Sequence, residues 1–239
     1  MSVSINSDMG ESLGIHSFGN DDGLLELVDT VNIACGFHSG DPSGIHATVI
    51  KAAEAQVTIG AHPGLPDIAG FGRREMKLDA DEVRDIVLYQ VGALGGFLKA
   101  EGLELHHIKP HGSLYGMLAR DETLMEAVCD VAEVYGVPVF GMAGTAHERV
   151  TARRGVPFVS EVYVDLDYRS DGTLIIARRP QRTPLDKVEA TTRRALESST
   201  VLTESGELLP VIFESICVHS DTPNAIDVAR VVRRVMSEF

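Results

Sequence analysis

The sequence has no tryptophan and little cysteine. Its three cysteines, Cys35, Cys129 and Cys217, lie far apart in a chain of 239 residues and form no C-x-x-C pair. An odd number of isolated cysteines argues against a disulfide framework and against a cysteine-based zinc site, and it is typical of a reducing compartment. We therefore expect a cytoplasmic protein.

Basic residues are also scarce. Lys and Arg number 21 against 35 Asp and Glu, which leaves a net charge of −14. A field of this sign repels phosphate backbones and anionic lipids, so we expect no nucleic-acid partner and no membrane surface. The chain has neither an apolar run of membrane-spanning length nor the basic and apolar segments of a signal peptide at its start.

The residues present are those of a globular protein, with 44% hydrophobic and 23% charged side chains. Short β-branched runs alternate with amphipathic stretches, which predicts seven β-α units. The expected strands are 3–8, 30–36, 57–62, 105–110, 137–141, 156–161 and 215–219. The expected helices begin at Asp41-Pro42, at Asp79 with Glu82, at Asp121, near Pro184 and at Thr222-Pro223, and Gly102, Gly136 and Gly155 end three of them.

Parallel strands joined by helices form either an open sheet or a closed barrel. The first strand is followed by Asp8-Met9-Gly10-Glu11 and not by the G-x-G-x-x-G turn of a dinucleotide fold, so a parallel (β/α) barrel is favoured. We expect one domain over residues 1–239. An insertion at about 168–210 carries hairpin signals at Ser170-Asp171-Gly172 and Glu204-Ser205-Gly206.

Polar side chains gather where the expected strands end. The catalytic candidates are Asp8, His38, His62, Lys109, His111, Glu161 and Asp165, and His219 is a substrate-binding candidate. Because the carboxyl ends of parallel strands share one rim, these groups are expected to form a single site. A carboxylate with two imidazoles serves as a general base with orienting groups, or as an open site for a divalent metal, so both roles stay open for Asp8, His38 and His62.

Two adjacent arginines follow the third strand, in Phe71-Gly72-Arg73-Arg74. A guanidinium fork suits a carboxylate or a phosphate, so Arg73 or Arg74 is a candidate substrate clamp. No G-x-x-x-x-G-K-[ST] loop occurs in the sequence.

Six ordered motifs resemble the LamB/YcsF family, which includes the A subunits of bacterial 5-oxoprolinase. They lie at 8–12, 32–42, 59–64, 70–74, 109–112 and 216–223. The resemblance implies an incomplete seven-stranded barrel similar to the glycoside hydrolase/deacetylase superfamily. It also implies ATP-dependent opening of the small-molecule lactam 5-oxo-L-proline to L-glutamate together with B and C subunits. Because the chain has no Walker loop, ATP is expected to act through the complex, and the isolated chain is expected to open 5-oxoproline negligibly.

One position departs from the family pattern. Leu166 stands where the family usually has an arginine, and Arg169, Arg178, Arg179 and Arg182 are candidates to replace it. Two alternatives stay open: a stand-alone metal-dependent amidase or deacetylase, and a non-catalytic ligand-binding paralogue, which is the alternative that the missing arginine supports.

Overall fold

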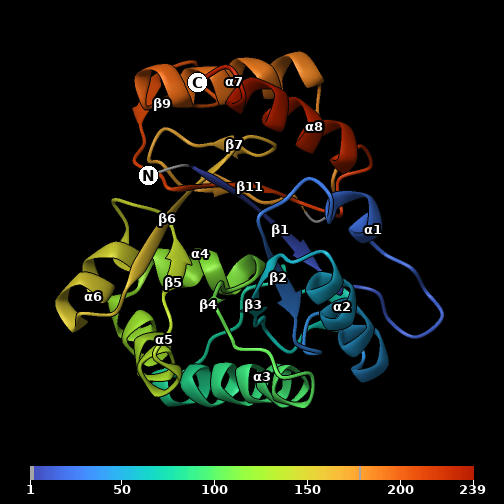
Figure 1. Cartoon of the computed structure of the whole chain (residues 1–239). Helices are drawn as coiled ribbons and strands as arrows, with labels where there is room; N and C mark the ends of the chain where they lie inside the picture. The colour runs from blue at the N-terminus through green and yellow to red at the C-terminus, as the bar shows by residue number, and fades with distance from the viewer. Residues whose placement is uncertain (1–2, 178) are drawn as a thin grey trace.

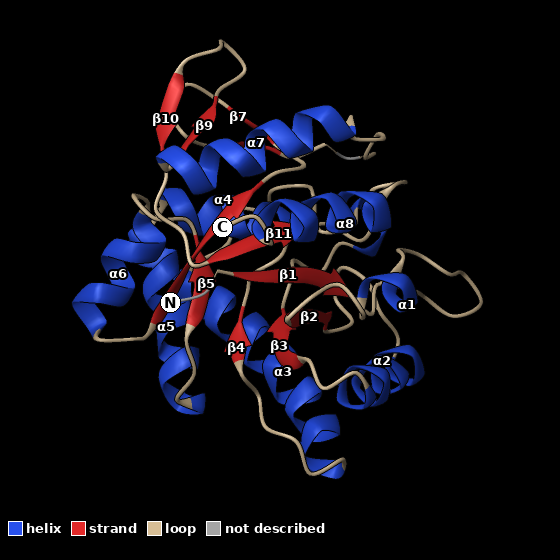
Figure 2. Cartoon of the chain, turned by 45° about the horizontal axis from the view of Figure 1, so that its top comes forward, coloured by secondary structure: helices blue, strands red, loops and turns tan. Residues whose placement is uncertain are grey.

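Seven parallel strands close into a barrel in the computed structural model, which describes residues 3–177 and 179–239. They are β1 (Ser4–Met9), β2 (Thr30–Ala34), β3 (Thr58–His62), β4 (His107–Ile108), β5 (Val139–Gly141), β6 (Phe158–Tyr163) and β11 (Ser215–Val218). β1 pairs with both β2 and β11, which closes the strand order β1-β11-β6-β5-β4-β3-β2 into a ring without a free edge. Figure 2 shows the strands in red. The predicted barrel is confirmed, and it is incomplete in having one strand fewer than the eight of a TIM barrel.

Helices surround the strands (Figure 1). They are α1 (Asp21–Leu24), α2 (Pro42–Glu54), the 3-10 turn η1 (Ile68–Gly70), α3 (Ala80–Ala100), α4 (Gly112–Arg120), α5 (Glu122–Tyr135), α6 (Ala146–Arg154), α7 (Leu185–Ser198) and α8 (Ala225–Met236). Their apolar faces pack on the outside of the strands, where residues such as Val31, Val91, Leu94, Val128 and Val232 are buried. None of the described helices combines the length and apolarity that a membrane span requires.

Most of the predicted helix starts are confirmed. Asp41 accepts from the backbone of Ser43 and Gly44, Asp79 and Glu82 form the capping box, and Asp121 caps α5. The start at Thr222-Pro223 is wrong, because α8 begins at Ala225 after Asn224. The Asn224 side chain makes two hydrogen bonds to the backbone of Thr183 (3.0 and 2.9 Å), which ties the start of α8 to the chain before α7.

The segment between β6 and β11 contains both predicted hairpins and the predicted helix. β7 (Asp167–Tyr168) pairs antiparallel with β8 (Leu174–Ile175), and β9 (Thr200–Leu202) pairs antiparallel with β10 (Leu208–Pro210), with α7 between them. Residues 174–177 and 180–184 of this segment line a cavity at the carboxyl ends of the barrel strands. The segment therefore covers one rim of the barrel.

The inside of the barrel is polar. Alternate residues of a strand point to the same face, so Asn6 and Asp8 on β1 point inward, as do His107 on β4 and Lys109 just after it. All four are buried, and hydrogen bonds connect them across the barrel through Asn32 of β2. A polar interior of this kind must be internally paired, because an unpaired buried polar group destabilises the fold.

Candidate active site

A cavity of about 310 Å³ opens at the carboxyl ends of the strands. Most of the predicted site residues line it: Asp8, His62, Arg73, Lys109, His111, Asp165 and His219. The insertion contributes an apolar wall that includes Leu174, Ile175, Ile176 and Pro180. The volume lies in the range of small-molecule sites.

Lys109 lies at the bottom of the cavity between two carboxylates. Its Nζ is 3.3 Å from Asp8 Oδ1 and 3.1 Å from Glu161 Oε2, and its side chain is only 2% exposed. It also donates to Asn6 Oδ1 (2.9 Å). Burial by itself lowers the pKa of Lys109, but the charges of Asp8 and Glu161 raise it well above its usual value, so the amine stays an ammonium.

Asp8 is held in its ionised form. Burial acts to raise the pKa of Asp8, but His62 and Lys109 together hold it well below its usual value. Asn32 Nδ2 also donates to Asp8 Oδ1 at 2.8 Å. Asp8 Oδ1 lies 3.5 Å from His62 Nε2, and Asp8 Oδ2 lies 3.8 Å from His219 Nε2. The carboxylate therefore sits between two imidazoles.

Glu161 does not line the cavity. The predicted strand ended at Glu161, but β6 continues to Tyr163, so Glu161 lies one layer deeper in the barrel. Its carboxylate accepts from Asn6 Nδ2 (3.0 Å) and from the hydroxyls of Tyr163 (3.1 Å) and Tyr115 (3.4 Å). Glu161 thus binds the Lys109 ammonium from the interior of the barrel, outside the cavity.

Asp165 and His219 form a pair on one wall of the cavity. The backbone N–H of His219 donates to Asp165 Oδ2 (2.8 Å), and His219 Nδ1 lies 3.0 Å from Asp165 Oδ1. Burial alone lowers the pKa of His219, but the carboxylates of Asp165 and Asp8 raise it above its usual value. The two carboxylates therefore favour the protonated form of His219, which suits a general acid.

A second group of imidazoles lies beside Asp8. His111 Nδ1 is 2.9 Å from His62 Nε2, and the rings of His38 and His111 stack with centroids 3.7 Å apart. Glu11 Oε1 lies 3.4 Å from His38 Nε2 and 3.7 Å from His111 Nδ1. Ligand atoms of Glu11, His38, His62 and His111 all lie within 4.8 Å of one another, and this set is the histidine cluster below.

The histidine cluster contains polar atoms without partners. Within the described part of the chain, both ring nitrogens of His38 and Oε1 of Glu11 are buried and accept or donate no hydrogen bond. Burial, together with the charges of Asp221 and Asp8, raises the pKa of Glu11 well above its usual value, and burial lowers that of His38. These unpaired atoms are available to a ligand.

Sequence reasoning missed Glu11. Its position three residues after Asp8, at the same strand end, was a usable signal. Sequence reasoning also missed the layer beneath the cavity, where His107 Nε2 donates to Asn32 Oδ1 at 2.6 Å. Gly60 makes room for the His107 ring, because a Cβ at this position would overlap the ring atoms.

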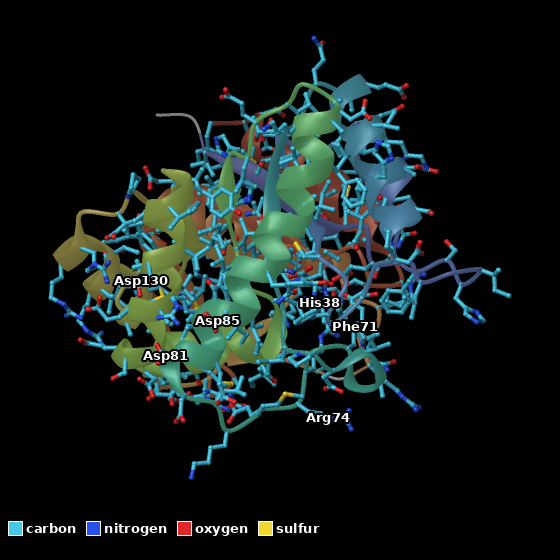
Figure 3. All side chains as sticks on the ribbon, turned by 90° about the horizontal axis from the view of Figure 1, so that it is seen from below. His38, Phe71, Arg74, Asp81, Asp85 and Asp130 are labelled. Atoms are coloured by element: carbon cyan, nitrogen blue, oxygen red, sulfur yellow. The ribbon has the colours of Figure 1, made fainter. Side chains whose placement is uncertain are left out.

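The two candidate arginines point to different places. Arg73 lines the cavity and is bound to Asp221 Oδ2 (2.7 Å) and to the backbone oxygen of Ala177 (3.0 Å). Arg74 is half-exposed and pairs with Asp67 outside the cavity. In Figure 3, Arg74 lies towards the edge of the molecule, whereas His38 and Phe71 lie further inside.

Leu166 also lines the cavity, so the departure from the family pattern falls on its wall. Of the arginines that could replace the missing one, Arg182 lines the same cavity and Arg169 lines a second cavity next to it. Arg179 is exposed, and Arg178 lies outside the described residues.

Comparisons with known proteins give a consistent picture. The model of the LamB/YcsF family matches residues 3–239. A lactam utilization protein lamB of Emericella nidulans is 45% identical over 239 residues, covering 98% of this chain and 94% of that protein. The 5-oxoprolinase A subunit of Bacillus subtilis is 41% identical over 238 residues, covering 97% and 92%.

Solved structures agree with the fold. The crystal structure of a lactam utilization protein from Thermus thermophilus has a TM-score of 0.90 at 38% identity and covers 100% of this chain and 97% of that chain. A putative cellobiose-phosphate cleavage protein from Enterococcus faecalis has a TM-score of 0.58 at 12% identity, covering 99% and 94%. At 12% identity, the similarity to this second structure supports the fold alone.

Proposed function

The chain belongs to the LamB/YcsF family, as its motifs predicted, and from this premise we propose that it is the subunit of a 5-oxoprolinase that opens the lactam of 5-oxo-L-proline to L-glutamate. Relatives named as A subunits of 5-oxoprolinase match almost the whole chain at about 40% identity. Their names favour this function over a stand-alone amidase or deacetylase and over a non-catalytic paralogue.

One observation carries the proposal: the His219 imidazole, whose protonated form Asp165 and Asp8 favour, and the Asp8 carboxylate lie 3.8 Å apart on one small cavity. Opening an amide ring requires water to attack the carbonyl carbon and a proton to reach the departing nitrogen. His219, charged through Asp165, supplies that proton. The Asp8 carboxylate accepts the proton that the attacking water loses and, from 3.8 Å, returns a proton to His219 after the ring has opened.

Lys109 acts indirectly in this proposal. It is bound on both sides by carboxylates and stays charged, so it neither accepts nor delivers a proton. Its charge keeps Asp8 ionised and fixes the position of the carboxylate. Lys109 is therefore a positioning residue.

The lactam is a stable amide, and its carbonyl must be activated before water attacks. We propose that ATP provides this activation through the complex, since the chain has no Walker loop. The B and C subunits complete the ATP-coupled step, and the naming of the relatives as A subunits supports such partners. The three free, buried cysteines support a cytoplasmic location for the complex.

The histidine cluster fits a divalent metal. His62 Nδ1 donates to the Lys109 backbone oxygen (2.7 Å), and His111 Nε2 donates to the Phe71 backbone oxygen (2.8 Å). Carbonyl oxygens only accept, so in the neutral imidazoles the two nitrogens that face each other at 2.9 Å both carry lone pairs. A divalent cation held by His62 and His111 would remove this repulsion.

The unpaired nitrogens of His38 and Oε1 of Glu11 complete a donor set of three imidazoles and one carboxylate, which suits Zn²⁺ or a similar ion. When bound, such an ion polarises a carbonyl oxygen or lowers the pKa of a bound water. The set differs from the expected Asp8, His38 and His62, because Asp8 groups instead with Cys217 and His219.

Metal analysis of protein purified without a histidine tag tests the cluster. We expect about one ion per chain, lost in His38→Gln and Glu11→Gln and retained in His46→Gln, whose ring pairs with Glu101 on the surface. Metal content that is zero in the native protein, or equal in all variants, would contradict the assignment.

The function is tested by glutamate release from 5-oxoproline in the mixture of the purified chain with B and C subunits, with and without ATP. Asp8→Asn and His219→Gln should lower turnover by roughly 10²- to 10⁴-fold, the range for loss of acid-base groups, and His46→Gln should leave it unchanged. Turnover by the chain alone would instead favour a stand-alone amidase. Unaltered turnover in both site variants would exclude the proposed roles.

A further inference from the structure

We propose that the second cavity, next to the proposed lactam site, binds the phosphoryl group of an anionic ligand. This cavity is about 470 Å³ and is lined by residues of α4, the chain before α3, and the β7–β8 hairpin. It shares Arg73, Tyr115, Leu174 and Ile176 with the first cavity. The two cavities are therefore adjacent and share one wall.

Positive charge is concentrated in the second cavity. Its lining includes four arginines, Arg73, Arg74, Arg120 and Arg169, and one acidic residue, Glu75. The whole chain has a net charge of −14. A basic cavity within an acidic protein attracts anions locally while the rest of the surface repels them.

The arginines differ in how fully they are neutralised. Arg120 pairs with Glu75 (2.5 Å), and Arg74 pairs with Asp67. Arg169 donates to two neutral oxygens, Thr173 Oγ1 (3.4 Å) and the Leu174 backbone oxygen (3.0 Å). Among the residues that the structure describes, Arg169 forms no ion pair, and Asp171, the carboxylate whose pKa its charge lowers, is exposed to solvent, so the guanidinium is available to a ligand.

Arg73 provides an independent indication of a ligand. Its side chain is only 7% exposed, lines both cavities and pairs with Asp221 through Nη2. Its Nε is buried and has no hydrogen-bond partner in the described part of the chain. A buried donor without an acceptor is costly, and an anionic oxygen at the junction of the cavities removes that cost.

The chemistry of the lining favours a phosphoryl group. Guanidinium groups bind phosphate oxygens through paired N–H donors, and a phosphoryl group offers enough oxygens for several arginines at once. Ser113, in the first turn of α4, adds a hydroxyl to the lining, and the N-terminal end of the helix also favours an anion. Apolar contacts come from Ala119, Met142 and Ile176.

The use of this site rests on the proposed function. If the first cavity holds the lactam, a phosphoryl group attached to the lactam oxygen extends past Arg73 towards Arg169. The polyphosphate of a nucleotide that donates this group would reach the same arginines. Both ligands present the same chemistry, and the experiment separates them.

Binding is measured by titration calorimetry on the full chain at low salt, with inorganic phosphate, tripolyphosphate and ADP as separate probes. Arg169→Met and Arg120→Met are compared with Arg230→Met, which removes one charge from an arginine that is 67% exposed on α8. We expect Arg169→Met to weaken binding at least tenfold, as the loss of a charged hydrogen-bonding group does. Arg120→Met should weaken it less, and Arg230→Met should leave it unchanged.

Tighter binding of tripolyphosphate and ADP than of phosphate would identify a nucleotide polyphosphate, and equal binding would identify a single phosphoryl group. The proposal is overturned if no probe binds, or if Arg169→Met and Arg230→Met weaken binding equally. A thermal melt checks each variant, and Arg169→Lys replaces Arg169→Met if that protein does not fold. Because this assay needs neither lactam nor partner subunits, an inactive complex with intact anion binding would refute only the proposed function.

Discussion

The substitution Lys109→Met should destabilise the protein strongly at neutral pH. Lys109 is the cation between Asp8 and Glu161, at 3.3 and 3.1 Å, and all three side chains are buried. Methionine fills a similar volume but leaves two carboxylates in the barrel without their counter-ion. Because the packing is preserved, the change in stability reports the loss of the electrostatic interaction.

Removing one partner of a buried ion pair costs about 3–5 kcal/mol. For a chain of this size, each kcal/mol lowers the melting temperature by roughly 2–4 °C, which predicts a fall of roughly 6–20 °C. Asp8 has a lowered pKa in the folded protein, so its stabilising contribution is present above its ordinary value of 3.8 and is lost as the pH falls through the folded value. Without Lys109 the stabilising contribution of Asp8 is smaller. The loss of unfolding free energy caused by Lys109→Met should therefore be largest near pH 7 and should decrease below about pH 4.

Urea unfolding at pH 7 and at acidic pH measures this effect. Lys99→Met, at an exposed position of α3, is the matched control and should change stability little. The double variant Lys109→Met/Glu161→Gln should recover part of the loss, because one of the unpaired charges is then absent. A Lys109→Met protein within about 1 kcal/mol of the native one at pH 7, or a penalty that does not depend on pH, would refute the reasoning.

Two further substitutions test separate parts of the structure. Asp165→Asn should lower the pKa of His219, because Asp165 is the carboxylate that contributes most to raising it; an NMR titration of the His219 ring measures this, and an unchanged midpoint would contradict the pairing. His219 stabilises the fold below its ordinary pKa of 6.5 and loses that contribution as the pH rises through its folded value, so the variant should be less stable than the native protein mainly on the acidic side. Gly60→Ala places a Cβ against the His107 ring and should destabilise the protein by about 1–3 kcal/mol or more. Gly96→Ala is the control: a Cβ there has no atom within 4 Å, so it should stabilise the helix by about 0.5–1 kcal/mol. Equal thermal midpoints for the two variants would contradict the role of Gly60.

Local patterns in the sequence were sufficient to identify the strands and most of the helix starts. The alternation of β-branched runs with capped amphipathic stretches identified all seven barrel strands, and the Gly-containing turns at 170–172 and 204–206 identified both hairpins. Strands and tight turns are set by residues that are close together in the chain, so a sequence pattern can identify them. The start of α8 was missed because a distant contact, between Asn224 and Thr183, decides it.

The rule that polar residues at parallel strand ends meet was also sufficient to bring Asp8, His62, Lys109 and His219 to one cavity. The rule did not show how far inside the barrel each residue lies. Glu161 lies below the cavity because β6 runs two residues further than its β-branched pattern indicated, and inward-facing positions on successive layers are equivalent in sequence.

Only the tertiary structure decided which groups face each other. Arg73 and Arg74 are neighbours with the same chemistry, yet Arg73 lines both cavities, whereas Arg74 lines only the second cavity and pairs with Asp67. The left-handed backbone of Phe71 and Gly72 (φ 55° and 62°) turns the chain just before them. Glu11 joins the three histidines of the cluster because β1, β2, β3 and β4 lie side by side and bring their following loops together. The residue types of the site were readable in the chain, but their distances, burial and charge states arise from closure of the barrel, which no local pattern encodes.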